Sequence, residues 1–315
     1  MMMALVMPED TLYCFDKIKL ISGEILSICG NFDGPWYRAR LAFYPNAATT
    51  RMIDGVSYRK ASYETGYRIP SCQKVLNLRG EQHFIVHRTQ IVRIYRASKA
   101  FEGLSHENAK RCQCFIDLLK NACRLSKDRH GLTGSGALHN ILPTSDFDWV
   151  IYDRDPTSIS TYVLSNTKKF KKELTFDMKH VYRKYAAFTG LNRKAILDLF
   201  KDRWKYFRFQ NLRISLSFTD PQRRADDFLS PFELGKRVVL RGIITDSIGC
   251  YYMPYIIPIC SNGKNHLVLT WLFLYNGAFK NGDVVEVSGR EQVVRGKQYL
   301  LVEELRDHIR KSTAL

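Results

Sequence analysis

A stretch in the middle of the chain reads GLTGSGALHNILPTSDFDWVIYD, and in it two aspartates, Asp146 and Asp148, alternate with aromatic residues. Side chains of a β-strand point to opposite faces in turn, so we expect both carboxylates on one face and Phe147, Trp149 and Ile151 on the other. Carboxylates one strand repeat apart lie about 6 to 7 Å from each other and can share Mg²⁺ ions. The stretch therefore predicts a strand with an apolar face and a face that binds Mg²⁺, with Mn²⁺ as the alternative ion.

A Gly-Ser-Gly turn precedes this acidic strand. Gly134 and Gly136 flank Ser135 and permit a sharp turn whose backbone N–H groups approach a ligand closely. Residues 137–141 are predicted to begin a helix, and the start of a helix favours bound phosphate. The sequence thus predicts a nucleotide-binding turn beside a metal-binding strand, an arrangement that orients a triphosphate for in-line attack by a hydroxyl group.

The order of helix, strand, Gly-Ser turn and acidic strand resembles the DNA polymerase β-like nucleotidyltransferase superfamily, whose signature is Gly-Ser followed about ten residues later by Asp-x-Asp. Gly134, Ser135, Asp146 and Asp148 stand at the signature positions. The string TGSGAL to SDFDWVIYD, and the N-terminal run GVSYRKASYETGYRIPS, are similar to archaeal-type predicted nucleotidyltransferases. The resemblance implies Mg²⁺-dependent transfer of a nucleoside monophosphate from a nucleoside triphosphate to an acceptor. Its specific part covers about 25 residues and a looser part most of the chain.

The superfamily normally adds a third carboxylate from a neighbouring strand. The strand expected here, LRISLSFTD, carries Ser215 and Ser217 where an acid could stand, and its one acid is Asp220. We rank Asp220 first as the third catalytic acid, with Asp177 of ELTFDMKH as the alternative if that segment is a strand. If neither reaches the site, the protein uses a weaker metal geometry or binds nucleotide without turning it over.

Basic residues exceed acidic ones in the chain, with 48 Lys and Arg against 31 Asp and Glu and a net charge of +17. This excess favours polyanionic partners, and nucleic acid leads among them. Between Lys168 and Arg213 fourteen basic residues meet only four acids and alternate with aromatics. We expect this stretch to bind a nucleic-acid acceptor, with an RNA end such as that of tRNA favoured. The residues predicted for this role are Lys168, Lys169, Lys171, Lys172, Arg183, Lys184, Arg203 and Lys205.

Three regions are expected in an α+β fold. Residues 1–100 predict a small mixed α/β domain, and residues 101–222 predict the transferase core, in which Ser105 caps a helix of about twenty residues. Residues 223–315 contain five strands punctuated by glycine, which predicts a small β-barrel that resembles an OB-fold.

Apolar runs, the first residues and the cysteines indicate where the protein is located. No apolar run reaches the length of a membrane span, and the first ten residues do not predict a signal peptide, so a cytoplasmic protein without a membrane partner is expected. Eight cysteines are predicted to be reduced core residues. Two alternatives stay open: a non-catalytic nucleic-acid-binding protein on a degenerate transferase scaffold, and a toxin-like nucleotidyltransferase that modifies a protein or small molecule. The sequence does not determine the nucleotide, the acceptor or the oligomeric state.

Overall fold

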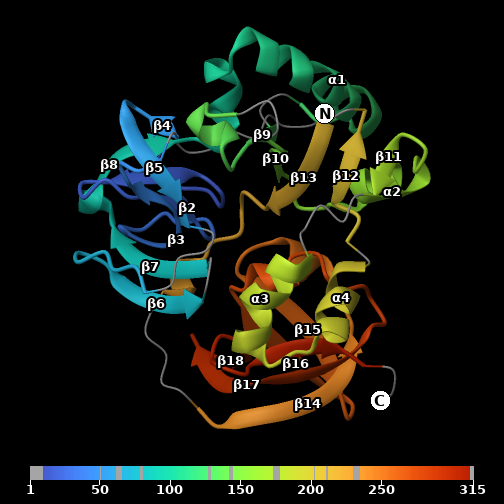
Figure 1. The fold of residues 1–315 in the computed structure, drawn as a ribbon. Helices are drawn as coiled ribbons and strands as arrows, with labels where there is room; N and C mark the ends of the chain where they lie inside the picture. The colour runs from blue at the N-terminus through green and yellow to red at the C-terminus, as the bar shows by residue number, and fades with distance from the viewer. Residues whose placement is uncertain are drawn as a thin grey trace.

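The computed structural model describes residues 10–49, 51–61, 66–78, 81–126, 129–141, 145–172, 178–201, 203–210, 212–229 and 235–312. Three sheets follow one another along the chain, and α-helices accompany the second and third (Figure 1). The fold is mixed α+β, as predicted.

The N-terminal sheet is antiparallel, with strand order β4-β5-β3-β2-β1-β8 and with β7 joining β3 to β6. The described part of residues 10–95 contains strands and 3₁₀ turns but no α-helix, so the mixed α/β content expected there is not found. The strands are β1 (Lys17–Leu20), β2 (Ile25–Ile28), β3 (Trp36–Pro45), β4 (Met52–Ile53), β5 (Val56–Lys60), β6 (Gln73–Leu78), β7 (Glu81–His87) and β8 (Ile91–Tyr95).

The middle sheet has strand order β11-β12-β13-β10-β9, in which only β10 and β13 run parallel. A helix, α1, precedes this sheet in the chain. Ser105 caps its N-terminus by accepting a hydrogen bond from the Asn108 N–H at 3.3 Å, which confirms the predicted N-cap. The elements of this region are α1 (His106–Cys123), β9 (His130–Leu132), β10 (Phe147–Tyr152), α2 (Thr157–Ser165), β11 (Phe170–Lys172), β12 (Tyr206–Phe209) and β13 (Leu212–Thr219).

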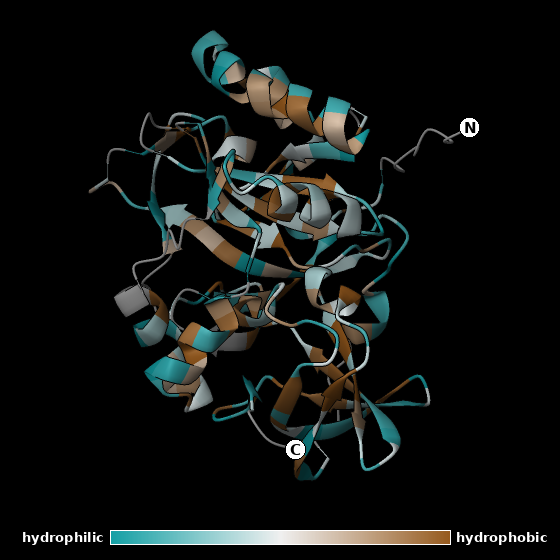
Figure 2. Ribbon diagram, turned by 90° about the vertical axis from the view of Figure 1, so that its right-hand side faces the viewer, coloured by the Kyte–Doolittle hydropathy of each residue, from teal (hydrophilic) through white to brown (hydrophobic). Residues whose placement is uncertain are grey.

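The two faces of β10 differ as the alternation predicted. Phe147, Trp149 and Ile151 are buried in one core with apolar residues of α1 and α2, such as Phe115 and Ile159. Figure 2 shows apolar stretches along the strands of this sheet and polar ones on the surrounding turns. One face of the sheet is therefore closed by helices. On the other face, Asp148 is followed by Val150 and Tyr152, which are buried in a core with the N-terminal sheet.

Two further helices, α3 (Met178–Thr189) and α4 (Arg193–Lys201), carry much of the basic stretch. α4 packs on the C-terminal barrel, because its residues Ile196 and Leu199 share a core with barrel residues and it contacts the last strand (Figure 1). α3 packs on α4 and contacts β6 of the N-terminal sheet. No helix within the described ranges is both long and apolar enough to cross a membrane.

The C-terminal region forms a closed five-stranded barrel, as the glycine-punctuated strands predicted. The order is β14-β15-β16-β18-β17, the pair β14–β17 closes the barrel, and only β16 and β18 run parallel. Arg295 and Gly296, with φ of 47° and 74°, make the tight turn of the β17–β18 hairpin. The strands are β14 (Arg237–Ile244), β15 (Tyr255–Ser261), β16 (Lys264–Thr270), β17 (Val284–Val294) and β18 (Lys297–Leu301), with β19 (His308–Lys311) added beside β17.

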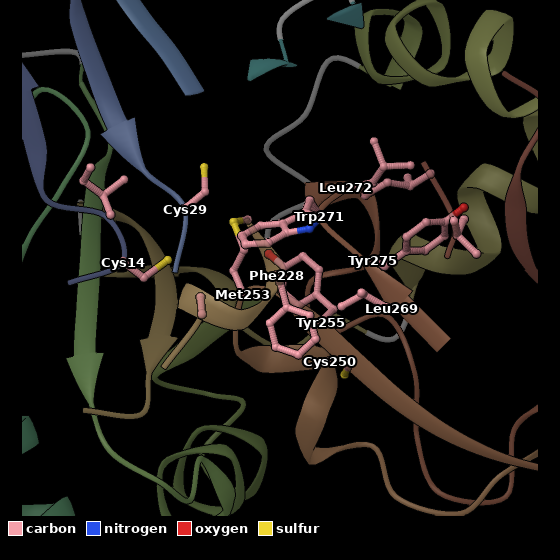
Figure 3. Close-up of a cluster of buried hydrophobic side chains, with 14 of the residues drawn as sticks. Cys14, Cys29, Phe228, Cys250, Met253, Tyr255, Leu269, Trp271, Leu272 and Tyr275 are labelled. Atoms are coloured by element: carbon pink, nitrogen blue, oxygen red, sulfur yellow. The ribbon is translucent and has the colours of Figure 1, made fainter. Parts of the chain in front are cut away.

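A continuous core joins the N-terminal sheet to the barrel. Figure 3 shows Cys14 and Cys29 of the N-terminal region in the same cluster as Met253 and Trp271 of the barrel. Beside this cluster the Arg38 guanidinium lies 4.2 Å from the Trp271 ring centre and forms a buried ion pair with Glu303. The shared core fixes the barrel against the N-terminal sheet.

Candidate active site

A cavity of about 470 Å³ lies where the three sheets and the helical pair meet. The N-terminal sheet lines it with residues of β1, β3 and β5, the middle sheet with residues of β10, β12 and β13, and the barrel with Phe273. Gly134, Ser135, Asp146 and Asp148 all line this cavity. The structure therefore brings the predicted turn and the predicted acidic strand to one site.

Asp148 is fixed by its neighbours in the sheet. It lies directly opposite Ser215 in the parallel β10–β13 pair, and the Ser215 hydroxyl donates a hydrogen bond to its carboxylate. Burial and the neighbouring Asp146 carboxylate raise the pKa of Asp148, while Ser215, Lys60 and Lys17 act in the opposite direction. Asp148 is thus a half-buried carboxylate beside a second, exposed one.

Gly134 lies against this carboxylate. Its φ is +61°, a left-handed conformation that favours glycine, and a Cβ built on it would lie 2.1 Å from Asp148 Oδ2. The turn is also tied to the strand through the Thr133 N–H, which donates to the Asp148 carbonyl at 2.8 Å. The glycine of the signature is needed because the turn and the carboxylate share the same space.

The turn does not lead into the expected helix. Residues Gly136–Leu138 form only a short 3₁₀ helix, η5, and His139 ends it with a φ of 53°. The N–H groups of Gly136 and Ala137 donate to the Thr133 carbonyl at 3.0 and 3.3 Å. The predicted role of Gly136 as a phosphate donor is therefore not supported, and Gly134 and Ser135 are the residues of the turn that line the cavity.

Asp220 does not join the two aspartates. Because β10 and β13 run parallel, the end of β13 lies beside Asp153 and not beside Asp148, and four residues separate Ser215 from Asp220. Asp220 instead lies 3.6 Å from the Arg154 guanidinium and accepts from the Gln222 N–H. The alternative, Asp177, lies outside the described residues.

The N-terminal sheet adds cations that sequence reasoning did not single out. Lys17, Arg40 and Lys60 line the cavity from β1, β3 and β5. The buried Lys17 ammonium donates to Ser27 Oγ at 2.8 Å and to Thr133 Oγ1 at 3.2 Å, directly before Gly134. Burial and the charge of Arg40 lower the pKa of Lys17 to about 8. The alternation of arginines in WYRARLAF is the one sequence signal that indicates a charged face on β3.

A buried carboxylate from β7, that of Glu81, binds residues that line the cavity. Glu81 accepts from Lys184 Nζ at 2.9 Å, from the Tyr185 hydroxyl and from the Phe273 N–H at 3.2 Å. Burial raises the pKa of Glu81, but the charges of Lys184 and Arg40 and these hydrogen bonds outweigh it and leave the pKa lowered. Glu81 thereby joins the N-terminal sheet, α3 and the barrel at the cavity.

The other predicted nucleic-acid-binding residues divide into exposed and buried ones. Lys168, Lys169, Lys171 and Arg183 are exposed, and the side chain of Lys172 lies outside the described part of the structure. Lys184 lines the cavity in its pair with Glu81. Arg203 also lines the cavity, but it and Lys205 are 2% and 0% exposed, so neither belongs to an outer binding surface.

Asp146 and Asp148 are the residues that would hold a divalent cation. Two carboxylates are enough for Mg²⁺, which takes its other ligands from water and substrate phosphates. In the part of the chain that the structure describes, no group of three or more His, Cys, Asp or Glu side chains could hold a metal ion. The donor set therefore fits an ion held in part by its substrate and not a closed protein site.

A scan against protein-family models, a search of curated proteins and a search of solved structures find no match to this chain.

Proposed function

We propose that this protein is a Mg²⁺-dependent nucleotidyltransferase that moves a nucleoside monophosphate from a nucleoside triphosphate to a hydroxyl of a nucleic-acid acceptor, with an RNA end favoured. The observation that carries the proposal is the shared cavity. It combines two carboxylates with the Gly-Ser turn and a wall of cations from other parts of the chain. A nucleoside triphosphate is the ligand whose charge and shape require both the carboxylates, which hold its Mg²⁺, and the cations, which contact its phosphates.

The cations account for the charge of the triphosphate. Six basic residues line the cavity against two acids, and they come from β1, β3, the segment before β4, β5, α3 and the segment after α4: Lys17, Arg40, Arg51, Lys60, Lys184 and Arg203. Positive groups fixed in a cavity before the ligand arrives stabilise developing negative charge without further reorganisation. We assign the cations of this wall other than Lys184, which pairs with Glu81, to the β- and γ-phosphates.

The two aspartates account for the reaction at the α-phosphate. Asp146 and Asp148 would bind Mg²⁺, which supplies charge neutralisation at the phosphates when bound. The acceptor oxygen forms a bond to the α-phosphorus, the bond from that phosphorus to the bridging oxygen breaks, pyrophosphate leaves, and the hydroxyl proton passes to water. Ser135 and the turn amides hold the leaving phosphates, so that the attacking and leaving oxygens lie in line.

The acceptor assignment comes from charge and from the third domain. The net charge of +17 favours a polyanion over a protein acceptor. The strand order of the barrel, with its antiparallel closure and one parallel pair, is similar to an OB-fold, a fold that often binds single-stranded nucleic acid.

One observation favours a second function. Ser215 occupies the position beside Asp148 where a third carboxylate would be expected, which fits a nucleic-acid-binding protein on a scaffold that has lost catalysis. This alternative predicts RNA binding that is unchanged by Asp146→Asn and Asp148→Asn, with no release of pyrophosphate.

The test is transfer of label from each of the four α-³²P-labelled nucleoside triphosphates, with Mg²⁺, to total RNA and to total protein. Label in RNA that needs Asp148 supports the proposal, and label in protein supports the protein-modifying alternative. Absence of label with every nucleotide, together with intact RNA binding, contradicts the proposal and supports the second function.

A further inference from the structure

A row of basic residues lies next to the cavity, on the face of the middle sheet that carries Asp146 and Asp148. The register pairs Lys171 of β11 with Arg208 of β12, and Arg208 with Arg213 of β13. Side chains paired across neighbouring strands point to the same face. Lys171 and Arg213 are exposed and Arg208 is partly exposed.

This row ends at the acidic pair. In the parallel pairing of β10 with β13, Phe147 lies opposite Ile214. Asp146 and Arg213 each precede one of these residues, so they are neighbours at the same edge of the sheet. The adjacent row on the same face contains Asp148, Ser215 and Tyr206, all of which line the cavity. Neighbouring strands are about 4.8 Å apart, so the basic row leads from Asp146 across three strand spacings, about 14 Å, to the edge of the sheet.

The row continues beyond the edge strand. Lys168 and Lys169 lie in the turn that enters β11 and are exposed. The opposite face of the same strands is the apolar core, where Phe170, Phe207 and Phe209 are buried. The row Lys171, Arg208 and Arg213 thus lies on the side of the sheet to which the candidate active site opens.

The barrel carries cations too, and three of its arginines pair with acids of the barrel. Arg241 and Arg310 both contact Glu286, at 2.9 and 2.7 Å, and Arg237 contacts Asp307 at 2.9 Å. Cations that already hold a carboxylate partner gain less from a phosphate. We therefore assign no polyanion track to these three barrel arginines.

We infer that the row Lys171, Arg208 and Arg213 binds the backbone of a single-stranded RNA and directs its end toward Asp146. The track delivers a terminal hydroxyl to the acidic pair while the cation wall of the cavity holds the triphosphate. The claim that the delivered RNA end is the acceptor rests on the proposed nucleotidyl transfer. The claim that the row binds RNA is independent of it.

The experiment is a fluorescence-anisotropy titration of a 5′-fluorescein-labelled, fifteen-nucleotide single-stranded RNA, without nucleotide or Mg²⁺, across a series of salt concentrations. The test variant is Lys171→Gln/Arg208→Gln/Arg213→Gln. The control is Lys99→Gln/Lys110→Gln/Lys120→Gln, which removes the same charge from exposed positions on η3 (Ala97–Gly103) and α1, the helix that covers the apolar face of the sheet.

We expect the test variant to bind RNA more weakly and to lower the slope of log affinity against log salt by about 2, the loss of three phosphate contacts to a single strand. The control keeps the wild-type slope, and both variants bind ATP as the wild type does. If the triple variant does not fold, Lys171→Gln alone is expected to lower the slope by about 0.7.

Wild-type RNA affinity and slope in the folded test variant would overturn the inference. Equal competition by polyglutamate of the same charge would also overturn it, because the row would then bind acidic chains in general. A 4-thiouridine at the 3′ end is expected to crosslink within β12 and β13, and crosslinks only to the barrel contradict the direction of the track. RNA binding through the row without any label transfer would leave the track standing and refute the proposed function.

Discussion

Gly134 and Asp148 occupy the same corner of the cavity, where a Cβ on the glycine would lie 2.1 Å from a carboxylate oxygen of the aspartate. Gly134→Ala is expected to reduce nucleotide transfer by about 100-fold, since a displacement of about 1 Å at a reacting centre can cost that much. The control is Gly55→Ala, where φ is +75° and no atom lies within 4 Å of the added Cβ. Both variants lose about 1 to 2 kcal/mol from the left-handed backbone, measured by denaturant unfolding. Equal activity in the two variants would show that contact with Asp148 is unimportant.

Ser215 lies where a third carboxylate would face Asp148. Ser215→Asp is expected to unfold at a lower temperature than the wild type in EDTA, because three like charges then lie together. Mg²⁺ is expected to raise its melting temperature more than that of the wild type. Ser217→Asp is the matched control, since Ser217 also lines the cavity but pairs with Val150, one strand repeat further on. The same response to Mg²⁺ in both variants would contradict a metal site at Asp148.

Glu81 is the buried partner of Lys184 and Tyr185. Removal of its charge in Glu81→Gln is expected to cost about 3 to 5 kcal/mol of unfolding free energy, because Lys184 and Arg40 stay buried without it. Asp198→Asn, which breaks an exposed pair with Lys201, is expected to cost no more than about 1 kcal/mol.

The pKa of Glu81 also sets a pH dependence of stability. Because this pKa is lower in the folded than in the unfolded chain, the stabilisation by Glu81 is present above the ordinary value of 4.5 and is lost as pH falls through the folded pKa. Urea unfolding between pH 6 and pH 3 is expected to show a steeper loss in the wild type than in Glu81→Gln. The same loss of unfolding free energy with falling pH in both proteins would contradict the stabilising pair of Glu81 with Lys184.

Lys17 predicts a pH dependence of nucleotide binding. The pKa of Lys17 is lowered to about 8 by burial, with Arg40 adding to the effect and Asp148 opposing it. A bound triphosphate favours the charged amine, so ATP affinity in EDTA is expected to fall above pH 8, by at most about tenfold per pH unit. Lys17→Arg, which stays charged, removes this dependence. Isothermal titration from pH 7 to pH 9.5 checks it, and a wild-type affinity constant over that range would place the triphosphate away from Lys17.

Local patterns predicted the parts of the fold that depend on neighbours in sequence. The alternation around Asp146 and Asp148, the Ser105 cap and the glycine-punctuated barrel strands all fall in the structure where the sequence indicated. Each depends on the period of a single strand or helix, which a short window contains.

The missed parts depend on long-range packing. Lys17 and Arg40 reach the site only because the N-terminal sheet packs beside the middle sheet, and nothing within β1 specifies that contact. The sequence ranks Asp220 first because it is the one acid of its strand, and only the parallel pairing shows that it lies at the far end. Arg203 looked exposed within a basic run, yet it is buried beside Phe200 and Leu274.

The most direct test of the central claim compares three single substitutions, Asp146→Asn, Asp148→Asn and Asp220→Asn, in the transfer of α-³²P label to RNA. Each removes one carboxylate charge and keeps the shape of the side chain. The account predicts that Asp146→Asn and Asp148→Asn each lose most of the transfer, whereas Asp220→Asn, at the far end of β13, keeps wild-type rates. Loss of transfer in Asp220→Asn, or its retention in Asp148→Asn, would contradict it.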